Sequence, residues 1–378
     1  MQAQQTKAKG LPGTVVAHQA SHAKVYIGSP SIAILPNGDY LAAHDFFGED
    51  SSEWTATKTA IYRSKNRGEA WKLETEIMGA FWSSLFVHKN NIYLLGTDRH
   101  FGNVVIRKST DNGTHWTEPR DENSGLLLTG EYHTSAVPVV VYEGRIWRAL
   151  ETASGVEPDW GKRFGAMMIS APANTDLLKA ANWTTSHSLP YHSAYLNGNF
   201  NGWLEGNAVV APNGEIYNIL RVDDKTSLTE KVALVSVDKN GLLASFDQNK
   251  DFVDFPGGSK KFTIRYDQVS ASYWALVNNV PERHREAYHG QNPSLIRNTL
   301  SLISSSDLRN WTIRKEVLHH PNADHYGFQY ADWVIDGNDL IFLSRTTWPD
   351  SNFEAGNSRQ SKYLTFHKIF DFRALLNV

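Results

Sequence analysis

The stretch Ser109–Trp116 reads STDNGTHW and fits the pattern Ser-x-Asp-x-Gly-x-x-Trp at every fixed position. Ser64–Trp71 (SKNRGEAW) fits it with Asn for Asp, and Ser305–Trp311 (SSDLRNW) is a shortened form without the glycine. In such a motif the Asp or Asn side chain accepts hydrogen bonds from backbone N–H groups and the glycine takes a positive φ. The tryptophan fills the gap between neighbouring sheets. The pattern therefore predicts a tight turn between strands that recurs along the chain.

Strands with turns of one design extend over the whole length. Ser31–Leu35 is followed by a Pro-Asn-Gly-Asp turn and Tyr40–His44, and Asn207–Ala211 by Pro-Asn-Gly-Glu and Ile216–Leu220. Runs of this kind joined by Asn-Gly or Asp-Gly are typical of β-hairpins. No linker or shift in composition interrupts them. We therefore predict an all-β fold with an N-terminal tail over residues 1–20 and a single domain over residues 21–378.

Composition limits the function classes. The chain has 378 residues and a net charge of −3, which gives no basic field for nucleic acid. It contains no cysteine, which excludes disulfides, thiol nucleophiles and Cys-ligated metals. Aromatic residues make up 12% of the chain, which suits a β-rich protein and one that stacks against sugar rings. We expect no cofactor, no metal site and no membrane span.

The repeated turn resembles the Asp-box of sialidase-like β-propellers. The first two copies begin at Ser64 and Ser109, 45 residues apart, which suits one four-stranded blade. This spacing favours a single seven-bladed propeller, with a six-bladed sialidase-like propeller with larger loops as the alternative. The resemblance implies that the boxes lie at the outer edge and are structural.

The same resemblance raises the question of a sialidase. Such an enzyme needs three arginines that clamp a carboxylate and a Tyr–Glu nucleophile pair, and its first arginine precedes the first hairpin. The matching stretch here, Tyr26–Ile32, reads YIGSPSI and contains no arginine. Because glycine cannot replace arginine in bidentate carboxylate binding, this stretch argues against a sialidase.

A second resemblance covers nearly the whole chain. Its segments are Tyr26–Ser31, Gly38–Tyr40, His44–Gly48, Trp203–Asn207, Asn218–Val222, Phe255–Asp267 and Gly327–Trp333. They resemble the seven-bladed propellers of glycoside hydrolase family 145, which are related to ulvan-type polysaccharide lyases. The resemblance implies a bacterial exo-acting α-L-rhamnosidase. Its substrate would be the L-rhamnose-α-1,4-D-glucuronic acid caps of plant arabinogalactan.

The family resemblance also implies a catalytic histidine, and the matching position is His44. Alternation along Leu41–Phe47 places His44 on one face of a strand and Asp45 on the other. An imidazole with an ordinary pKa of about 6.5 can take and give a proton near neutrality. We therefore expect His44 to lie exposed beside a pocket on one face of the propeller.

A second cluster resembles the site of the related lyases at the other end of the channel. Its candidates are His133, Arg148, Arg221, Arg265 and Tyr266. A lyase needs a cation for the uronate carboxylate, a base and an acid, and these residue types supply them. A polysaccharide lyase that cleaves next to a uronic acid is therefore one alternative function. A non-catalytic glycan-binding propeller is another.

The C-terminal third adds three candidate substrate-binding residues. His325, Gln329 and Arg345 flank one predicted hairpin and can line a sugar pocket. The expected partner is an acidic plant polysaccharide or oligosaccharide. Met1–Gln5 has no apolar core and so holds no signal peptide. The Gln-rich start and the lack of cysteine fit a periplasmic or secreted protein.

Overall fold

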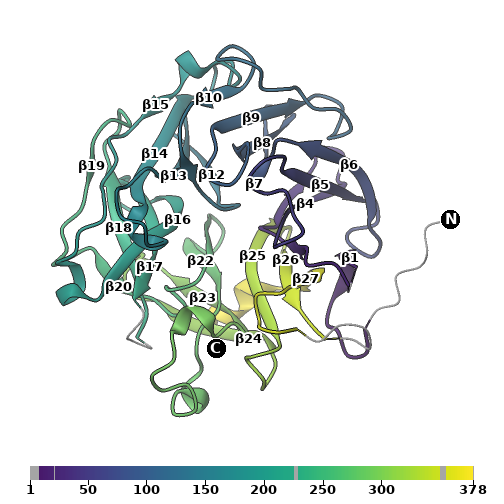
Figure 1. Cartoon of the computed structure of the whole chain (residues 1–378), viewed down its shortest axis with the longest axis vertical. Helices are drawn as coiled ribbons and strands as arrows, with labels where there is room; N and C mark the ends of the chain where they lie inside the picture. The colour runs from purple at the N-terminus through teal and green to yellow at the C-terminus, as the bar shows by residue number, and fades with distance from the viewer. Residues whose placement is uncertain (1–7, 21, 225–228, 350–354, 378) are drawn as a thin grey trace.

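Six antiparallel sheets form a ring in the computed structural model, which describes residues 8–20, 22–224, 229–349 and 355–377 (Figure 1). Blade 1 contains β2 (Tyr26–Ile27), β3 (Ser31–Ile34), β4 (Tyr40–Phe47), β5 (Lys58–Ser64) and β6 (Lys72–Met78). Blade 2 contains β7 (Phe81–His88), β8 (Asn91–Thr97), β9 (Val104–Ser109) and β10 (Leu126–Leu128). Blade 3 contains β11 (Tyr132–His133), β12 (Val139–Tyr142), β13 (Arg145–Thr152), β14 (Gly165–Pro172) and β15 (Thr184–Thr185).

The other half of the ring follows the same plan. Blade 4 contains β16 (Phe200–Val210), β17 (Ile216–Asp224), β18 (Lys231–Val237), β19 (Ala244–Ser245) and β20 (Phe252–Asp254). Blade 5 contains β21 (Thr263–Asp267), β22 (Ser272–Val277), β23 (Thr299–Ser305) and β24 (Thr312–His319). Blade 6 contains β25 (Gly327–Asp336), β26 (Asp339–Thr347), β27 (Tyr363–Ile369) and β1 (Thr14–His18). Helical structure in the described residues is limited to 3₁₀ turns at Gly161–Arg163, Ala180–Asn182, Tyr195–Gly198, Glu282–His284, Pro293–Leu295 and Phe372–Asn377.

The N-terminal strand closes the ring. β1 pairs with β27, so the first and last strands of the chain share blade 6. Thr14–His18 therefore belongs to the propeller rather than to the N-terminal tail expected over residues 1–20. This pairing joins the first and last strands of the described residues within one sheet and so closes the ring.

The blade number corrects the preferred prediction. The all-β propeller is confirmed, but it has six blades, as in the alternative, and not seven. The 45-residue spacing of the first two boxes is shorter than the average length of a blade in residues. Several blades are longer because long connections at one face of the ring separate their strands. Examples are the segments between β4 and β5, between β22 and β23, and between β26 and β27.

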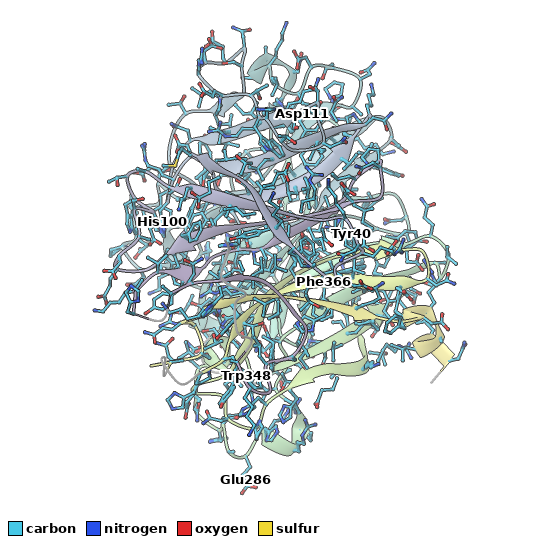
Figure 2. All side chains as sticks on the ribbon, turned by 90° about the vertical axis from the view of Figure 1, so that its right-hand side faces the viewer. Tyr40, His100, Asp111, Glu286, Trp348 and Phe366 are labelled. Atoms are coloured by element: carbon cyan, nitrogen blue, oxygen red, sulfur yellow. The ribbon has the colours of Figure 1, made fainter. Side chains whose placement is uncertain are left out.

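The predicted turns form as expected. In the box at Ser109–Trp116, Asp111 accepts backbone N–H groups of Thr114 and His115, and Gly113 has φ +90°. The shortened box holds the same bonds around Asp307, with Leu308 at φ 66° in the place of the glycine. Figure 2 shows Asp111 at the outer edge of the ring. The boxes are therefore peripheral and fix strand connections.

The innermost strands of the sheets line the central axis, and three of them, β7, β16 and β25, carry a bulge. The register of pairing shifts at Phe81/Ser84, Leu204/Asn207 and Gln329/Asp332. Within the three bulges Trp82, Glu205 and Tyr330 have φ of 48°, 55° and 56°. A bulge re-aims side chains and is over-represented beside active sites. The three bulges therefore mark the level of the channel at which a site is expected.

Candidate active site

A cavity of about 410 Å³ opens at one mouth of the central channel, and all six blades contribute to its lining. Its side chains fall into a cationic half and an aromatic half, with carboxylates between them. The lining residues are Gly28, Ser29, Asp45, Phe47, Glu53, Phe81, Trp82, His100, Trp160, Arg221, Asp223, Asn292, Ser294, Leu295, Arg297, Tyr330, Arg345 and Arg359.

Tyr330 lines this cavity, and the buried Glu205 lies beside it. Both belong to the bulged inner strands, and the Tyr330 hydroxyl is a hydrogen-bond partner of the buried Glu205 carboxylate. Burial raises the pKa of Tyr330, and Glu205 raises it further. Burial alone would raise the pKa of Glu205, but the charges of Arg221 and His133 outweigh it and the pKa is lowered. The pair is thus a protonated phenol beside an ionised carboxylate.

Three arginines surround this tyrosine. The Arg297 and Arg345 guanidinium carbons lie 5.7 and 5.1 Å from the centroid of the Tyr330 ring. Arg221 donates from Nη1 to Glu205 at 2.8 Å and from Nε to the carbonyl of Ser259. Burial is the largest of the effects that lower the pKa of Arg297 and of Arg345 to about 10. All three stay charged at neutral pH.

Two of these arginines have no counterion. Arg297 is held by the carbonyl of Ser294 and the side-chain oxygen of Gln329, and Arg345 by the carbonyl of Arg359. Among the described residues neither forms an ion pair, whereas Arg221 pairs with Glu205. Buried cations without partners are unfavourable unless an anion joins them. The cationic half of the cavity is therefore suited to a carboxylate.

Asp45 supplies a second carboxyl group. Its Oδ1 accepts the backbone N–H of Ser29 at 2.5 Å and its Oδ2 that of Trp82 at 3.1 Å. Burial raises the pKa of Asp45 to about 6, against the hydrogen bonds and the charge of Arg345. A carboxyl group with this pKa can donate a proton near neutrality and later accept one. Gly28 permits its position, since a Cβ there would lie 2.2 Å from Asp45 Oδ1.

The opposite half of the cavity is aromatic. Trp82, His100 and Trp160 line it, and the His100 ring is 4.7 Å from Trp82 and 5.7 Å from Trp160. Trp54 stacks on the outer side of His100 at 3.7 Å. Figure 2 shows His100 at one face of the ring. Such a surface can pack against the apolar face of a sugar.

His44 does not reach this cavity. Its ring is 0% exposed and lies 4.7 Å from Phe46 and 5.7 Å from Tyr62. Burial lowers its pKa to about 4, and Nδ1 lies 2.9 Å from the carbonyl oxygen of Asp45. The expectation that His44 is exposed beside a pocket is wrong. Alternation along β4 directs Asp45 to the channel, so His44 points to the other face of the sheet and packs against Phe46 and Tyr62. A proton-transfer role for His44 has no geometric support.

The five residues of the expected lyase cluster are divided. Arg221 lines the cavity, and His133 lies beneath its aromatic half with Nδ1 2.8 Å from Glu151. Arg148 is fully buried and donates to Ser84, Thr134, Ala149 and Ser135. Arg265 and Tyr266 line a different groove, and Arg265 pairs with Asp332. The acid, base and cation proposed for a lyase therefore do not meet.

The three C-terminal candidates also differ in position. Arg345 lines the cavity. Gln329 is buried behind it and holds Arg297, so it is a positioning residue rather than a contact. His325 is bonded at Nδ1 to the carbonyl of Ala355 and does not line the cavity. Arg221 and Arg345 thus fulfil the expectation of cationic side chains at a mouth of the channel.

The groove with Arg265 and Tyr266 is larger, at about 620 Å³. It touches the ends of the inner strands β12, β16 and β21, whereas the first cavity touches bulges nearer the beginnings of the strands. It therefore lies at the opposite mouth. Its walls are mainly valine, alanine, proline and tyrosine, and no cluster of titratable groups converges there. The smaller cavity is therefore the better candidate for an active site, because titratable side chains meet there.

Sequence reasoning assigned no role to Asp45 and Arg297, which line the cavity, or to Glu205, which lies beside it, and it considered Tyr330 only as a stacking surface for a sugar. A charged residue within the largely buried run Phe200–Val210 is the signal that could have found Glu205. Arg297 follows a 3₁₀ turn and has no strand pattern around it. No signal in the sequence marks it.

Two further findings concern the described part of the chain. No group of three or more His, Asp or Glu side chains gathers there in an arrangement that could hold a metal ion. No helix there has the length and apolar character needed to cross a membrane.

The sequence matches no protein-family model and no curated protein. Solved structures do match its fold. An α-L-arabinanase of Penicillium chrysogenum complexed with arabinobiose has a TM-score of 0.53 at 15% identity, covering 96% of this chain and 98% of that one. An α-L-arabinofuranosidase of Fusarium graminearum in complex with an iminosugar inhibitor gives 0.60 at 10% identity, covering 95% and 98%. A Hadza microbial sialidase gives 0.62 at 11% identity, covering 95% and 68%. At these identities the likeness shows the propeller fold alone.

Proposed function

We propose that the protein is a glycoside hydrolase that removes a carboxylate-bearing sugar from a glycan. The observation that carries the proposal is Tyr330, which lies between Arg297 and Arg345 and beside the ionised Glu205. The cations supply carboxylate binding, the tyrosine a nucleophile, and Asp45 a proton donor. The sugar-processing enzymes among the structural neighbours support the proposal through their shared fold.

The chemistry follows from the charges of these groups. Glu205 takes the phenolic proton while Tyr330 Oη attacks the anomeric carbon, and Asp45 protonates the departing glycosidic oxygen. Asp45, now ionised, then removes a proton from the water that cleaves the tyrosyl–sugar bond, and Glu205 returns its proton to Tyr330. All three enzyme groups regain their starting state, and the anomeric configuration is retained.

A tyrosine nucleophile suits an acidic sugar in particular. A carboxylate nucleophile would be repelled by the carboxylate of the substrate, whereas the phenol is neutral until Glu205 removes its proton. Burial keeps the pKa of Tyr330 raised, so the hydroxyl needs this base at neutral pH. Tyrosine nucleophiles are an established exception to the usual pair of carboxylates in glycosidases.

The narrower prediction from the sequence shares the acidic substrate but differs in its catalytic group. In rhamnose–glucuronate caps the released L-rhamnose is neutral and the glucuronate is the leaving group, whereas Arg297 and Arg345 beside Tyr330 favour a carboxylate on the released sugar. This specificity stays a prediction, and so does a periplasmic or secreted location. A lyase receives less support, because Tyr266, its expected acid, lies at the opposite mouth from Arg221.

The test is release of sugar from defined acidic glycans. The panel contains rhamnose-capped arabinogalactan, its rhamnosyl-glucuronate disaccharide, and sialyl-α-2,3-lactose. We expect release of the acidic sugar with retained configuration from sialyl-α-2,3-lactose and no ultraviolet-absorbing unsaturated uronate. Release of rhamnose from either of the other two probes, without cleavage of sialyl-α-2,3-lactose, would favour the narrower prediction instead. Tyr330→Phe, Glu205→Gln and Asp45→Asn should each lower the rate by about 10² to 10⁴-fold.

Tyr266→Phe is the matched control, since Tyr266 lies at the opposite mouth of the channel. It should leave the rate unchanged. Equal activity of Tyr330→Phe and wild type would refute the nucleophile. An unsaturated uronate would instead establish a lyase, and tight binding of all three probes without turnover would establish a glycan-binding protein.

A further inference from the structure

The aromatic half of the cavity has no role in the chemistry above. Trp160 lines the cavity and is 46% exposed, and Trp54 is 55% exposed at its rim. Such large apolar side chains are unfavourable in water unless they contact something. The two indoles enclose the His100 ring, at centroid distances of 3.7 Å from Trp54 and 5.7 Å from Trp160. The result is a continuous aromatic platform beside Asp45.

His100 adds a polar group to this platform. Its side chain is 9% exposed, and among the described residues neither ring nitrogen has a hydrogen-bond partner. The nearest carboxylate oxygen, from Glu53, is 3.7 Å from Nδ1, beyond hydrogen-bonding distance. Buried polar atoms without partners are rare and call for a ligand or water. The ring lines the cavity, but both nitrogens are covered by neighbouring side chains, so a hydrogen bond to a ligand there requires one of these side chains to turn aside.

Charge distinguishes this half from the arginine half. Burial lowers the pKa of His100 to about 3, and the charges of His133 and Arg163 add to the effect. The ring is therefore neutral at physiological pH and offers one donor and one acceptor nitrogen. Trp82 and Trp160 carry no charge. A hydroxyl group, which both donates and accepts, matches His100 better than an anion does.

We propose that Trp160, Trp54 and His100 form a subsite for a neutral pyranose, the sugar to which the acidic residue is attached. The sugar would stack its C–H face on the indoles and exchange a hydrogen bond with a His100 nitrogen. Its glycosidic oxygen would then face Asp45, whose Oδ2 is bonded to the backbone of Trp82 in the same wall. This inference rests on the proposed function for the order of the two sugars, and names a neutral hexopyranoside as the leaving group.

Binding of neutral disaccharides tests the subsite without any turnover. The probes are lactose and cellobiose, followed through the indole N–H resonances of the ¹⁵N-labelled full chain. Trp160→Ala and Trp54→Ala assign the two signals. We expect both to shift with a dissociation constant of about 1–10 mM, in the range of a small neutral contact. Glucuronate should bind at the arginines and leave these two signals in place.

Two variants separate the contribution of ring stacking from the contribution of the His100 hydrogen bond. Trp160→Ala should weaken lactose binding at least about tenfold, as expected for loss of a stacked ring. His100→Phe keeps the stacked ring but removes both nitrogens, and it should weaken lactose binding about threefold to tenfold. Tyr266→Ala, a matched exposed aromatic at the opposite mouth, should change nothing.

The inference is overturned if neither probe shifts the two indole signals at about 100 mM, well above the expected constant. Equal affinity of wild type and Trp160→Ala, or loss of binding only in Tyr266→Ala, also overturns it. Failure of every acidic glycan to be cleaved would refute the proposed function instead, and would leave the lactose result as it stands. The two failures are thus distinguishable.

Discussion

Replacing Arg297 by methionine should reduce carboxylate binding strongly and stability little. The pKa of Arg297 falls from 12.5 to about 10 on folding, chiefly through burial. Because pH 7 lies below both values, the side chain is charged in both states. At about 1.4 kcal/mol per pH unit, its burial then costs about 3 kcal/mol of folding free energy. Methionine removes that cost.

Methionine also removes two hydrogen bonds, to the Ser294 carbonyl and to Gln329. At about 1–1.5 kcal/mol each, their loss offsets most of the gain, so the free energy of unfolding should change by less than about 1 kcal/mol. Loss of the charge-assisted pair between Arg297 and the carboxylate of a ligand should weaken binding by about 3 kcal/mol, which is about 10²-fold in affinity. Calorimetric titration with glucuronate and N-acetylneuraminate, together with urea unfolding, measures both quantities.

Arg148→Met is the matched control. Arg148 has a similarly lowered pKa of about 10, but it donates four hydrogen bonds and does not line the cavity. It should lose about 2 kcal/mol of stability or more, since four acceptors lose their donor, and should keep its carboxylate affinity. If Arg297→Met instead loses as much stability as Arg148→Met while binding both acids as wild type does, Arg297 is structural and the anion-binding argument fails.

Three further outcomes follow from the same geometry. Burial raises the pKa of Asp45 to about 6, so Asp45 loses its proton above that pH. We therefore expect kcat/KM to fall about tenfold per pH unit above about pH 6. A profile that is flat from about pH 5 to 8 would contradict the role of Asp45 as the proton donor. Gly28→Ala would place a Cβ 2.2 Å from Asp45 Oδ1. It should lower turnover about 10²-fold in a folded protein, so an unchanged rate would show that Asp45 does not need its present position. His44→Ala should lose about 2–4 kcal/mol of stability in urea unfolding, because the ring is fully buried, but keep its activity per folded molecule; lost turnover at full stability would restore a catalytic role for His44.

The fold was largely predictable because its signals are local. A box such as Ser109–Trp116 contains the acceptor, the glycine and the tryptophan that its turn requires, and each bond forms within eight residues. The blade number was not predictable in this way. It depends on how many residues lie in loops such as the one between β22 and β23, and loop length has no periodicity to read.

The site was predictable only in part. Arg221 and Arg345 were expected in a pocket because a uronate needs a cation, and they line it. For β4 the alternation was correct, but it cannot say which face meets the channel, and the choice of His44 over Asp45 followed from the resemblance alone. The rest depends on long-range contacts: Glu205 and Tyr330 come from blades 4 and 6, and only the arrangement of blades around the ring brings them together.

The bulges explain why regular strand patterns could not locate this site. A side chain in an unbroken inner strand points either into a sheet interface or toward the channel, with a period of two. At Trp82, Glu205 and Tyr330 the backbone instead takes a positive φ, which for residues other than glycine costs about 1–3 kcal/mol each. The same level of blade 1 holds Gly28, Ser29 and Pro30, where β2 ends and β3 begins. Four inner strands thus leave regular geometry where the reacting groups converge. In the larger groove the non-glycine residue with a positive φ is Ala271, which lies in a turn rather than in an inner strand. The placement of strain within inner strands therefore supports the cavity around Tyr330.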